Sequence, residues 1–218
     1  MKVKWYGHSA FLLTSDKGFK IITDPYEPGG FGGAISYGRI PDEADVVLVS
    51  HDHADHNYVQ GLPGSPKIVK GVGSHSIKGL EIRGIAAYHD EQKGSQRGTN
   101  TIFCFTLDGL RICHLGDLGH VPTDQEAKQI GPVDVLFMPV GGFYTIDPAQ
   151  ATQTIQRINS RVIIPMHFKT PRCGFPLAIV EEFTKGKSAV KNLGASELEI
   201  KKEKLPPTPE IIVLQPAL

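Results

Sequence analysis

The stretch Val46-Val47-Leu48-Val49-Ser50-His51-Asp52-His53-Ala54-Asp55-His56 joins an aliphatic run to a cluster of histidines and aspartates. Four consecutive aliphatic residues without polar alternation predict a short strand that is covered on both faces of its sheet. The polar cluster follows where this strand would end, and loops at strand ends are where a rigid scaffold presents its chemistry. We therefore expect a buried strand that delivers functional side chains.

The polar cluster has the composition of a metal site. His51 and His53 are two residues apart, so both imidazoles project to the same side of an extended segment. Asp55 and His56 add a carboxylate and a third imidazole, and these ligand types suit zinc, manganese or iron. Four candidate ligands in six residues exceed what one tetrahedral ion takes from so short a segment. We therefore expect two neighbouring divalent ions.

Three further ligand-type residues each follow an apolar run. They are His89 after residues 85–88, Asp117 shortly after residues 110–113, and His167 after residues 162–166. Any one of them alone would more often be a structural residue. Because the same pattern recurs three times, the set is credible as the remainder of a metal site.

The rest of the chain predicts a layered α/β structure. Apolar runs predict strands at 1–7, 11–14, 19–22, 67–70, 80–88, 101–107, 110–115, 133–138, 161–165 and 210–214. Helical patterns cover 123–129, 147–158 and 176–185, while the glycine-rich residues 28–39 read as a loop and 186–209 as polar surface. This order is typical of sheets covered by helices, and we expect one domain over residues 1–218.

Composition narrows the classes of function. Lys plus Arg and Asp plus Glu both total 23, so no basic excess indicates a nucleic-acid partner, and no apolar run is long enough for a membrane span. The first residues lack the apolar stretch of a secretory signal. Three cysteines without CxxC spacing favour a reducing cytoplasm. We expect a cytoplasmic protein with a small-molecule partner; the oligomeric state is unreadable.

Taken in order, these residues resemble the five signature motifs of the metallo-β-lactamase superfamily. The motifs correspond to Asp24, the run from His51 to His56, His89, Asp117 and His167. Residues 5–12 (Trp-Tyr-Gly-His-Ser-Ala-Phe-Leu) and 22–25 (Ile-Thr-Asp-Pro) resemble its short, single-domain branch of metal-dependent hydrolases. That branch is similar to ascorbate-6-phosphate lactonases and N-acyl-phosphatidylethanolamine phospholipases.

The resemblance implies a fold and a ligand set. The fold would be an α+β, four-layer αββα sandwich with the site at one edge between its sheets. His51, His53 and His89 would hold one ion, and Asp55, His56 and His167 the second. Asp117 would bridge the two ions, and Asp24 would orient a ligand histidine.

These expectations define a reaction class. A hydroxide activated by the binuclear centre, with zinc the favoured metal, would cleave an ester, lactone or phosphodiester bond of a small substrate. Asp55 would ligate one ion and accept a hydrogen bond from the hydroxide. His8, Tyr144 and Lys169 are candidate substrate contacts, each weighed against an ordinary structural or loop role.

Three alternatives stay open from sequence. A nuclease or RNA-processing phosphodiesterase is disfavoured by zero net charge and a short chain. A diiron redox protein of the superfamily usually has Glu where His53 stands, and carries a flavin-binding domain. A non-catalytic module commonly lacks ligands, whereas this chain lacks none of them.

Overall fold

The first strands of the chain are buried on both faces. In the computed structural model, which describes residues 1–218, Trp5, Phe11 and Leu48 belong to one apolar cluster. Their strand neighbours, such as Leu12 and Val47, belong to a second cluster. Because successive side chains of a strand point to opposite faces, this sheet separates two apolar layers.

This six-stranded sheet contains the N-terminal strands and one late strand. Its order is β13 (Glu197–Glu199), β1 (Lys2–Gly7), β2 (Ala10–Thr14), β3 (Lys20–Thr23), β4 (Val46–Val49) and β5 (Lys67–Lys70). Strands from β13 to β3 pair antiparallel, whereas β3, β4 and β5 are parallel. The predicted buried strand is therefore β4, and it lies between two parallel neighbours.

The second sheet has eight strands. Its order is β12 (Val190–Asn192), β14 (Glu210–Val213), β11 (Val162–Met166), β10 (Val135–Pro139), β9 (Leu110–His114), β8 (Thr99–Leu107), β7 (Leu80–Tyr88) and β6 (Gly73–Ile77). Strands β6, β7, β8 and β9 pair antiparallel in that order. The remaining pairs, from β9 through β10, β11 and β14 to β12, are parallel. The two sheets pack face to face over a cluster of 44 buried apolar residues.

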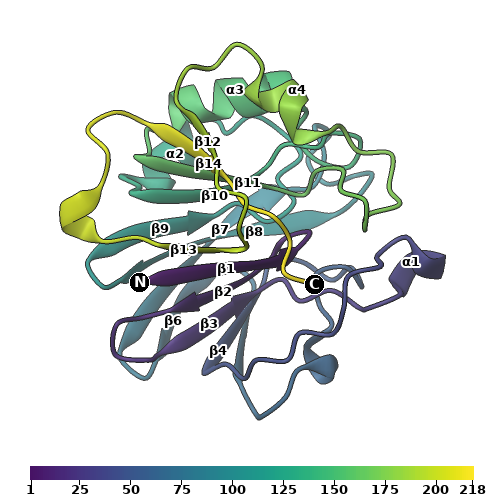
Figure 1. Ribbon diagram of the computed structural model, residues 1–218, viewed down its shortest axis with the longest axis vertical. Coiled ribbons are helices and arrows are strands. Elements are labelled where there is room, and N and C mark those ends of the chain that lie inside the picture. Colours follow the sequence, from purple (N-terminus) through teal and green to yellow (C-terminus); the bar gives the residue numbers. More distant parts are fainter.

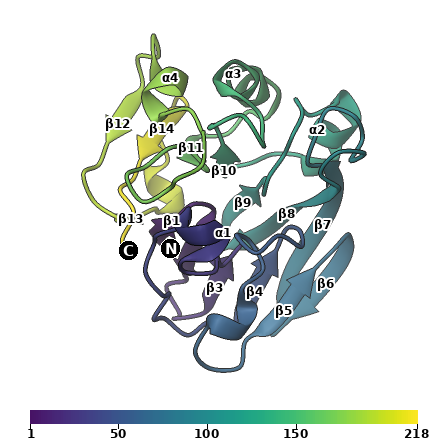
Figure 2. The ribbon, with the colours of Figure 1, turned by 90° about the vertical axis from the view of Figure 1, so that its right-hand side faces the viewer.

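Three helices lie on the side of the eight-stranded sheet that faces away from the other sheet (Figures 1 and 2). They are α2 (Asp124–Ile130), α3 (Pro148–Arg157) and α4 (Val180–Thr184). Thr123 and Asp147 cap the first two through capping boxes with Glu126 and Gln150. No helix combines the length and the apolarity that crossing a bilayer requires.

The outer face of the six-stranded sheet is covered mainly by a long connection. Tyr26, Ile35, Tyr37 and Ile40 pack there in the second apolar cluster. The only helices in this part are the single turns α1 (Gly30–Gly33) and η1 (Val59–Gly61). The expected α+β sandwich of the metallo-β-lactamase type is confirmed, with irregular chain over much of its fourth layer.

One sequence expectation for the later part of the chain was wrong in its bounds, and another left out short strands. The helix predicted at 176–185 begins only at Val180, because the backbone of Ala178 bonds to Gly141 and Lys169 instead. Residues 186–209 lie largely at the surface, as expected, but they also contain β12, β13 and a turn of 3₁₀ helix, η2 (Lys202–Lys204), which the sequence did not indicate. These strands are three residues long and largely exposed, so they carry no apolar pattern.

Candidate metal centre

The predicted ligands meet at one end of the sandwich, in loops that follow five strands. Asp24 follows β3, and the run from His51 to His56 follows β4. His89, Asp117 and His167 follow β7, β9 and β11. Together with His8, the candidate ligands form three groups in which all the ligand atoms lie within 4.8 Å of one another. The groups are His51, His53 and His89; His51, His56 and Asp117; and His8, Asp55, His56 and His167.

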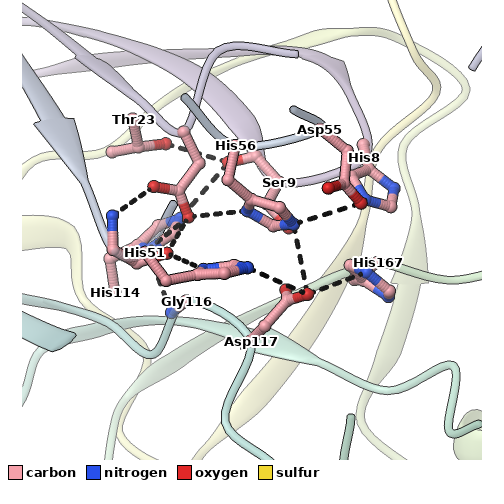
Figure 3. Close-up of polar contacts among 12 residues, drawn as sticks. His8, Ser9, Thr23, His51, Asp55, His56, His114, Gly116, Asp117 and His167 are labelled. Carbon is pink, nitrogen blue, oxygen red and sulfur yellow. Dashed lines mark hydrogen bonds and ion pairs between the residues drawn. The ribbon is translucent and has the colours of Figure 1, made fainter. Parts of the chain in front are cut away.

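The carboxylate of Asp117 faces several of these histidines, and Figure 3 shows it directed toward His51, His56 and His167. Its Oδ2 lies 3.1 Å from Nε2 of His56, 3.2 Å from Nε2 of His167 and 3.3 Å from Nε2 of His89. Nε2 of His51 lies 3.9 Å away. Asp117 itself is held in place by Asn100, whose Oδ1 accepts its backbone N–H at 3.0 Å.

Asp24 holds the far side of two histidines. Its Oδ2 accepts a hydrogen bond from Nδ1 of His56 at 3.1 Å and from Oγ of Ser50 at 2.7 Å. The same Ser50 Oγ lies 2.9 Å from Nδ1 of His51. With these outer nitrogens engaged, Nε2 of both imidazoles is directed toward Asp117. This is the orienting contact expected of Asp24.

His8 makes a structural hydrogen bond, which was the alternative weighed for it against a substrate contact. It is fully buried, and its Nε2 lies 3.1 Å from Oδ2 of Asp55. Its ring lies 4.1 Å from that of His167 between centroids. His8 does not line the cavity described below, so the structure makes it a neighbour of Asp55 rather than a substrate contact. In the sequence, only the motif at residues 5–12 marked His8 as a residue of interest, and nothing there indicated its contact with Asp55.

The backbone of the site is locally strained. His8, Asp24 and His167 have φ values of 51°, 39° and 51°, which side-chain-bearing residues seldom adopt. Such conformations persist where the surrounding structure imposes them, and they concentrate at functional sites. Close backbone approach adds a further constraint: a Cβ on Gly119 would lie 2.2 Å from the carbonyl carbon of His89.

The residues present fit divalent cations. Nε2 of His51, Nε2 of His56 and Oδ1 of Asp117 are buried without a hydrogen-bond partner. Buried polar atoms are normally paired, so unpaired ones need an explanation. Four Nε2 atoms that converge on one carboxylate oxygen cannot all donate to it. Imidazole nitrogens and carboxylate oxygens in this arrangement are the ligand types of zinc and similar metals.

The electrostatics of the site agree with this fit. Burial, reinforced by His56, lowers the pKa of His51 to about 3, and burial together with His167 lowers the pKa of His8 to about 4. Both rings are therefore neutral at pH 7, and a neutral imidazole is what metal ligation by His51 requires. Burial opposes a charge on His56, but Asp117 and Asp55 outweigh it and raise its pKa well above the ordinary value. The carboxylates thus favour positive charge at this point.

A cavity of about 360 Å³ opens onto the ligands. Five candidate ligands line it: His53, Asp55, His89, Asp117 and His167. The lining also includes Phe31, Tyr144 and Phe175, together with Gln96 and Arg97. Of the predicted substrate contacts, only Tyr144 reaches the cavity.

Lys169 is directed elsewhere, because its Nζ donates to the carbonyl oxygen of Phe175 at 2.8 Å. Sequence reasoning missed Phe31, Arg97 and Phe175 as cavity residues. Phe31 lies in the single turn α1, Arg97 and Phe175 lie in irregular segments, and none belongs to a motif of the chain.

Comparison with known proteins agrees with the fold. A family model described as the β-lactamase superfamily domain matches residues 2–167. A metal-dependent hydrolase from Thermococcus kodakarensis is 30% identical over 197 residues, which cover 78% of this chain and 85% of that protein. A similar metal-dependent hydrolase from Thermococcus onnurineus is 29% identical over 196 residues, with the same coverage.

Solved structures give the same result. A protein from Thermotoga maritima, described as a Zn-dependent hydrolase of the metallo-β-lactamase superfamily, superposes with a TM-score of 0.79 at 34% identity. The match covers 98% of this chain and 97% of that one. The metallo-β-lactamase fold protein YhfI from Bacillus subtilis, at 12% identity and a TM-score of 0.63, shares the fold. The chain belongs to the metallo-β-lactamase superfamily and is a metal-dependent hydrolase.

Proposed function

We propose that this hydrolase holds two divalent metal ions, zinc in the first instance, and cleaves an ester, lactone or phosphodiester bond of a small substrate. The observation that carries the proposal is the convergence of four imidazole Nε2 atoms on Oδ2 of Asp117. His51, His53 and His89 would hold one ion. Asp55, His56 and His167 would hold the other, with Asp117 between them.

The choice of zinc and of a small substrate has separate support. The relative from Thermotoga maritima is described as Zn-dependent. A cavity of about 360 Å³ lies at the lower end of the range for small-molecule sites. The three cysteines are free, which favours a cytoplasmic location for the enzyme.

The mechanism follows from the residues around the cavity. Divalent ions held there supply Lewis acidity: water becomes easier to deprotonate, and negative charge developing on the substrate is stabilised. Asp55 lines the cavity, and the contact of His8 with its Oδ2 fixes the carboxylate. Burial opposes its ionisation, but His56 and His8 keep its pKa below the usual range. Asp55 is therefore a hydrogen-bond acceptor that orients the attacking water toward the substrate.

Elemental analysis together with a substrate panel tests this function. The panel contains bis-aryl phosphodiesters, lactones and thioesters, and the protein is loaded with zinc, manganese or iron. We expect two ions per chain, with hydrolysis that a chelator abolishes and added metal restores. The visible absorption spectrum separates a diiron redox centre from a zinc site.

Two variants test the ligand assignment. His53→Ala and Asp117→Ala should each lose at least one ion per chain and reduce turnover by several orders of magnitude, because the centre is incomplete. His75→Ala is the matched control, since His75 lies on β6 outside the site. Metal-free protein with full activity would refute the proposal, and so would two ions retained by either variant.

A further inference from the structure

The cavity above the ligands has an aromatic wall, formed by Phe31, Tyr144 and Phe175. The rings of Phe31 and Phe175 lie 5.3 Å apart between centroids, and those of Tyr144 and Phe175 lie 5.5 Å apart. Phe31 is 53% exposed although it is a large apolar side chain. A single exposed aromatic needs no explanation, but three that line one concave surface beside catalytic groups form an apolar binding surface.

Arg97 adds one positive charge to this wall. Its guanidinium lies 5.5 Å from the centroid of the Tyr144 ring, and it is the only Lys or Arg that lines the cavity. Arg97 makes no ion pair and no side-chain hydrogen bond, whereas Arg111 and Arg157 pair with Asp134 and Asp124. A half-buried guanidinium without a carboxylate partner is free to bind an anion through paired N–H groups.

The loop that carries Arg97 is fixed in shape by Asp90. The Asp90 carboxylate accepts four backbone N–H groups, from Gln92, Gly94, Gln96 and Arg97, at 2.8 to 3.0 Å. Arg97 is one of these four residues, so its backbone position is set before any ligand arrives. A binding group held in this way loses little freedom on binding.

We propose that the substrate carries two recognition groups beside its scissile bond. One is an anionic group, carboxylate or phosphate, bound by Arg97. The other is an aromatic or extended apolar group that packs on the aromatic wall. This inference rests on the proposed hydrolase function, because it assigns the substrate class of the same site.

Binding of simple probes tests the anion site without relying on turnover. Benzoate, phenyl phosphate and neutral benzamide are titrated into the metal-loaded protein by calorimetry. Both anions should bind, and Arg97→Gln should lower their affinity about 10- to 100-fold, because the hydrogen bonds between the guanidinium and the anion are lost. Arg97→Lys should bind the anions with an affinity between those of the unaltered protein and Arg97→Gln, because lysine keeps the charge but lacks the paired N–H groups. Benzamide should bind equally to all variants.

The controls separate Arg97 from the metals. Arg157→Gln, which removes an exposed arginine on α3, should leave binding unchanged. Anion binding that persists in Arg97→Gln at full strength would show that the metals alone hold the anion, and would overturn the proposal. If only one anion loses affinity, that anion identifies the recognised group.

A matched pair of esters extends the test to turnover. The mono-4-nitrophenyl ester of succinate should have a higher kcat/KM than 4-nitrophenyl butyrate, and Arg97→Gln should remove that preference. Phe31→Ala should raise KM for both esters, whereas Phe143→Ala, an exposed aromatic outside the cavity lining, should not. Equal kcat/KM values for the two esters in the unaltered enzyme would contradict the proposal. Absence of hydrolysis at full metal occupancy would count against the proposed function and leave the calorimetric result standing.

Discussion

At the scale of single residues, the site depends on contacts behind its ligands as much as on the ligands themselves. Asp24 binds Nδ1 of His56 directly and reaches His51 through Ser50. It is fully buried, and its carboxylate also accepts the backbone N–H of Ser50 at 2.8 Å. One carboxylate therefore orients two of the imidazoles.

Replacing Asp24 should weaken metal binding while keeping every ligand. We expect Asp24→Asn to lower zinc affinity about 10- to 100-fold, because an amide carries no charge and has only one acceptor oxygen, so it cannot accept at both Oδ1 and Oδ2 as Asp24 does. Competition with a chromophoric chelator measures the affinity, and circular dichroism checks the fold. Asp124→Asn, an exposed aspartate on α2, is the control. Unchanged affinity in Asp24→Asn would show that Asp24 does not orient the ligands.

The candidate ligands could be predicted because most of the signal is local. Four of them lie within six consecutive residues, and the others each follow an apolar strand. The neighbours of these ligands could not be predicted in the same way. The contact of His8 with Asp55 joins two distant segments, and Arg97 reaches the cavity only through the turn that Asp90 organises.

At the scale of elements, loops that leave the same edge of a sheet approach one another closely, as after β7 and β9, which flank β8. Gly119 follows β9 and its backbone N–H donates to the carbonyl of Tyr88, at the end of β7. Only a hydrogen atom fits between Gly119 and the backbone of His89, because a Cβ would lie within 2.5 Å of three backbone atoms of His89 and Asp90. The position of His89 thus depends on a glycine in another loop.

A methyl group at this position should displace a ligand. We expect Gly119→Ala to move His89 and to lower the number of bound ions, with hydrolysis falling at least tenfold. Elemental analysis and kinetics measure both effects. Gly38→Ala is the control, since its Cβ would meet only Leu218 at 3.6 Å, an ordinary contact. Full metal content in Gly119→Ala would mean that the loops adjust freely.

The elements that sequence predicted well are those with a buried pattern. Strands such as β4 and β10 are wholly buried, so their aliphatic runs are unambiguous. The helical patterns at 123–129 and 147–158 likewise predicted α2 and α3, and in the structure both helices begin with a capping box. The missed strands β6, β12 and β13 are short and largely exposed, and they exist because a neighbouring strand offers them an edge. Tertiary pairing of this kind leaves no periodic signal.

At the scale of the whole molecule, buried charges join segments that the core alone would not align. Asp134 is 3% exposed and precedes β10. Its carboxylate accepts hydrogen bonds from Arg111, at the start of β9, and from Lys202 in η2. Burial opposes ionisation, but these cations hold the pKa of Asp134 at about 2.

This pairing predicts a pH-dependent contribution to stability. The folded pKa lies below the unfolded value of about 3.9, so ionised Asp134 stabilises the fold above pH 4 and stops doing so as pH falls toward 2. We expect Asp134→Asn to lower the free energy of unfolding by about 2 kcal/mol at pH 7. The difference from the unaltered protein should shrink below pH 4.

Urea unfolding at several pH values measures this effect. Asp124→Asn should change the free energy of unfolding by less than about 0.5 kcal/mol, because its ion pair with Arg157 is exposed. A difference between Asp134→Asn and the unaltered protein that stays constant from pH 7 to pH 2.5 would contradict the assignment.

The pairing of β1 with β13 has a consequence for how the protein forms. Lys2 and Glu199 are partners in this ladder, and Ala217 donates its backbone N–H to the carbonyl of Trp5. During synthesis the edge of β1 is left open until the last part of this sequence has emerged, and an open strand edge invites pairing with other chains. Contacts so distant in sequence also slow folding. The newly made chain is therefore most prone to aggregate just before the six-stranded sheet receives its final strand.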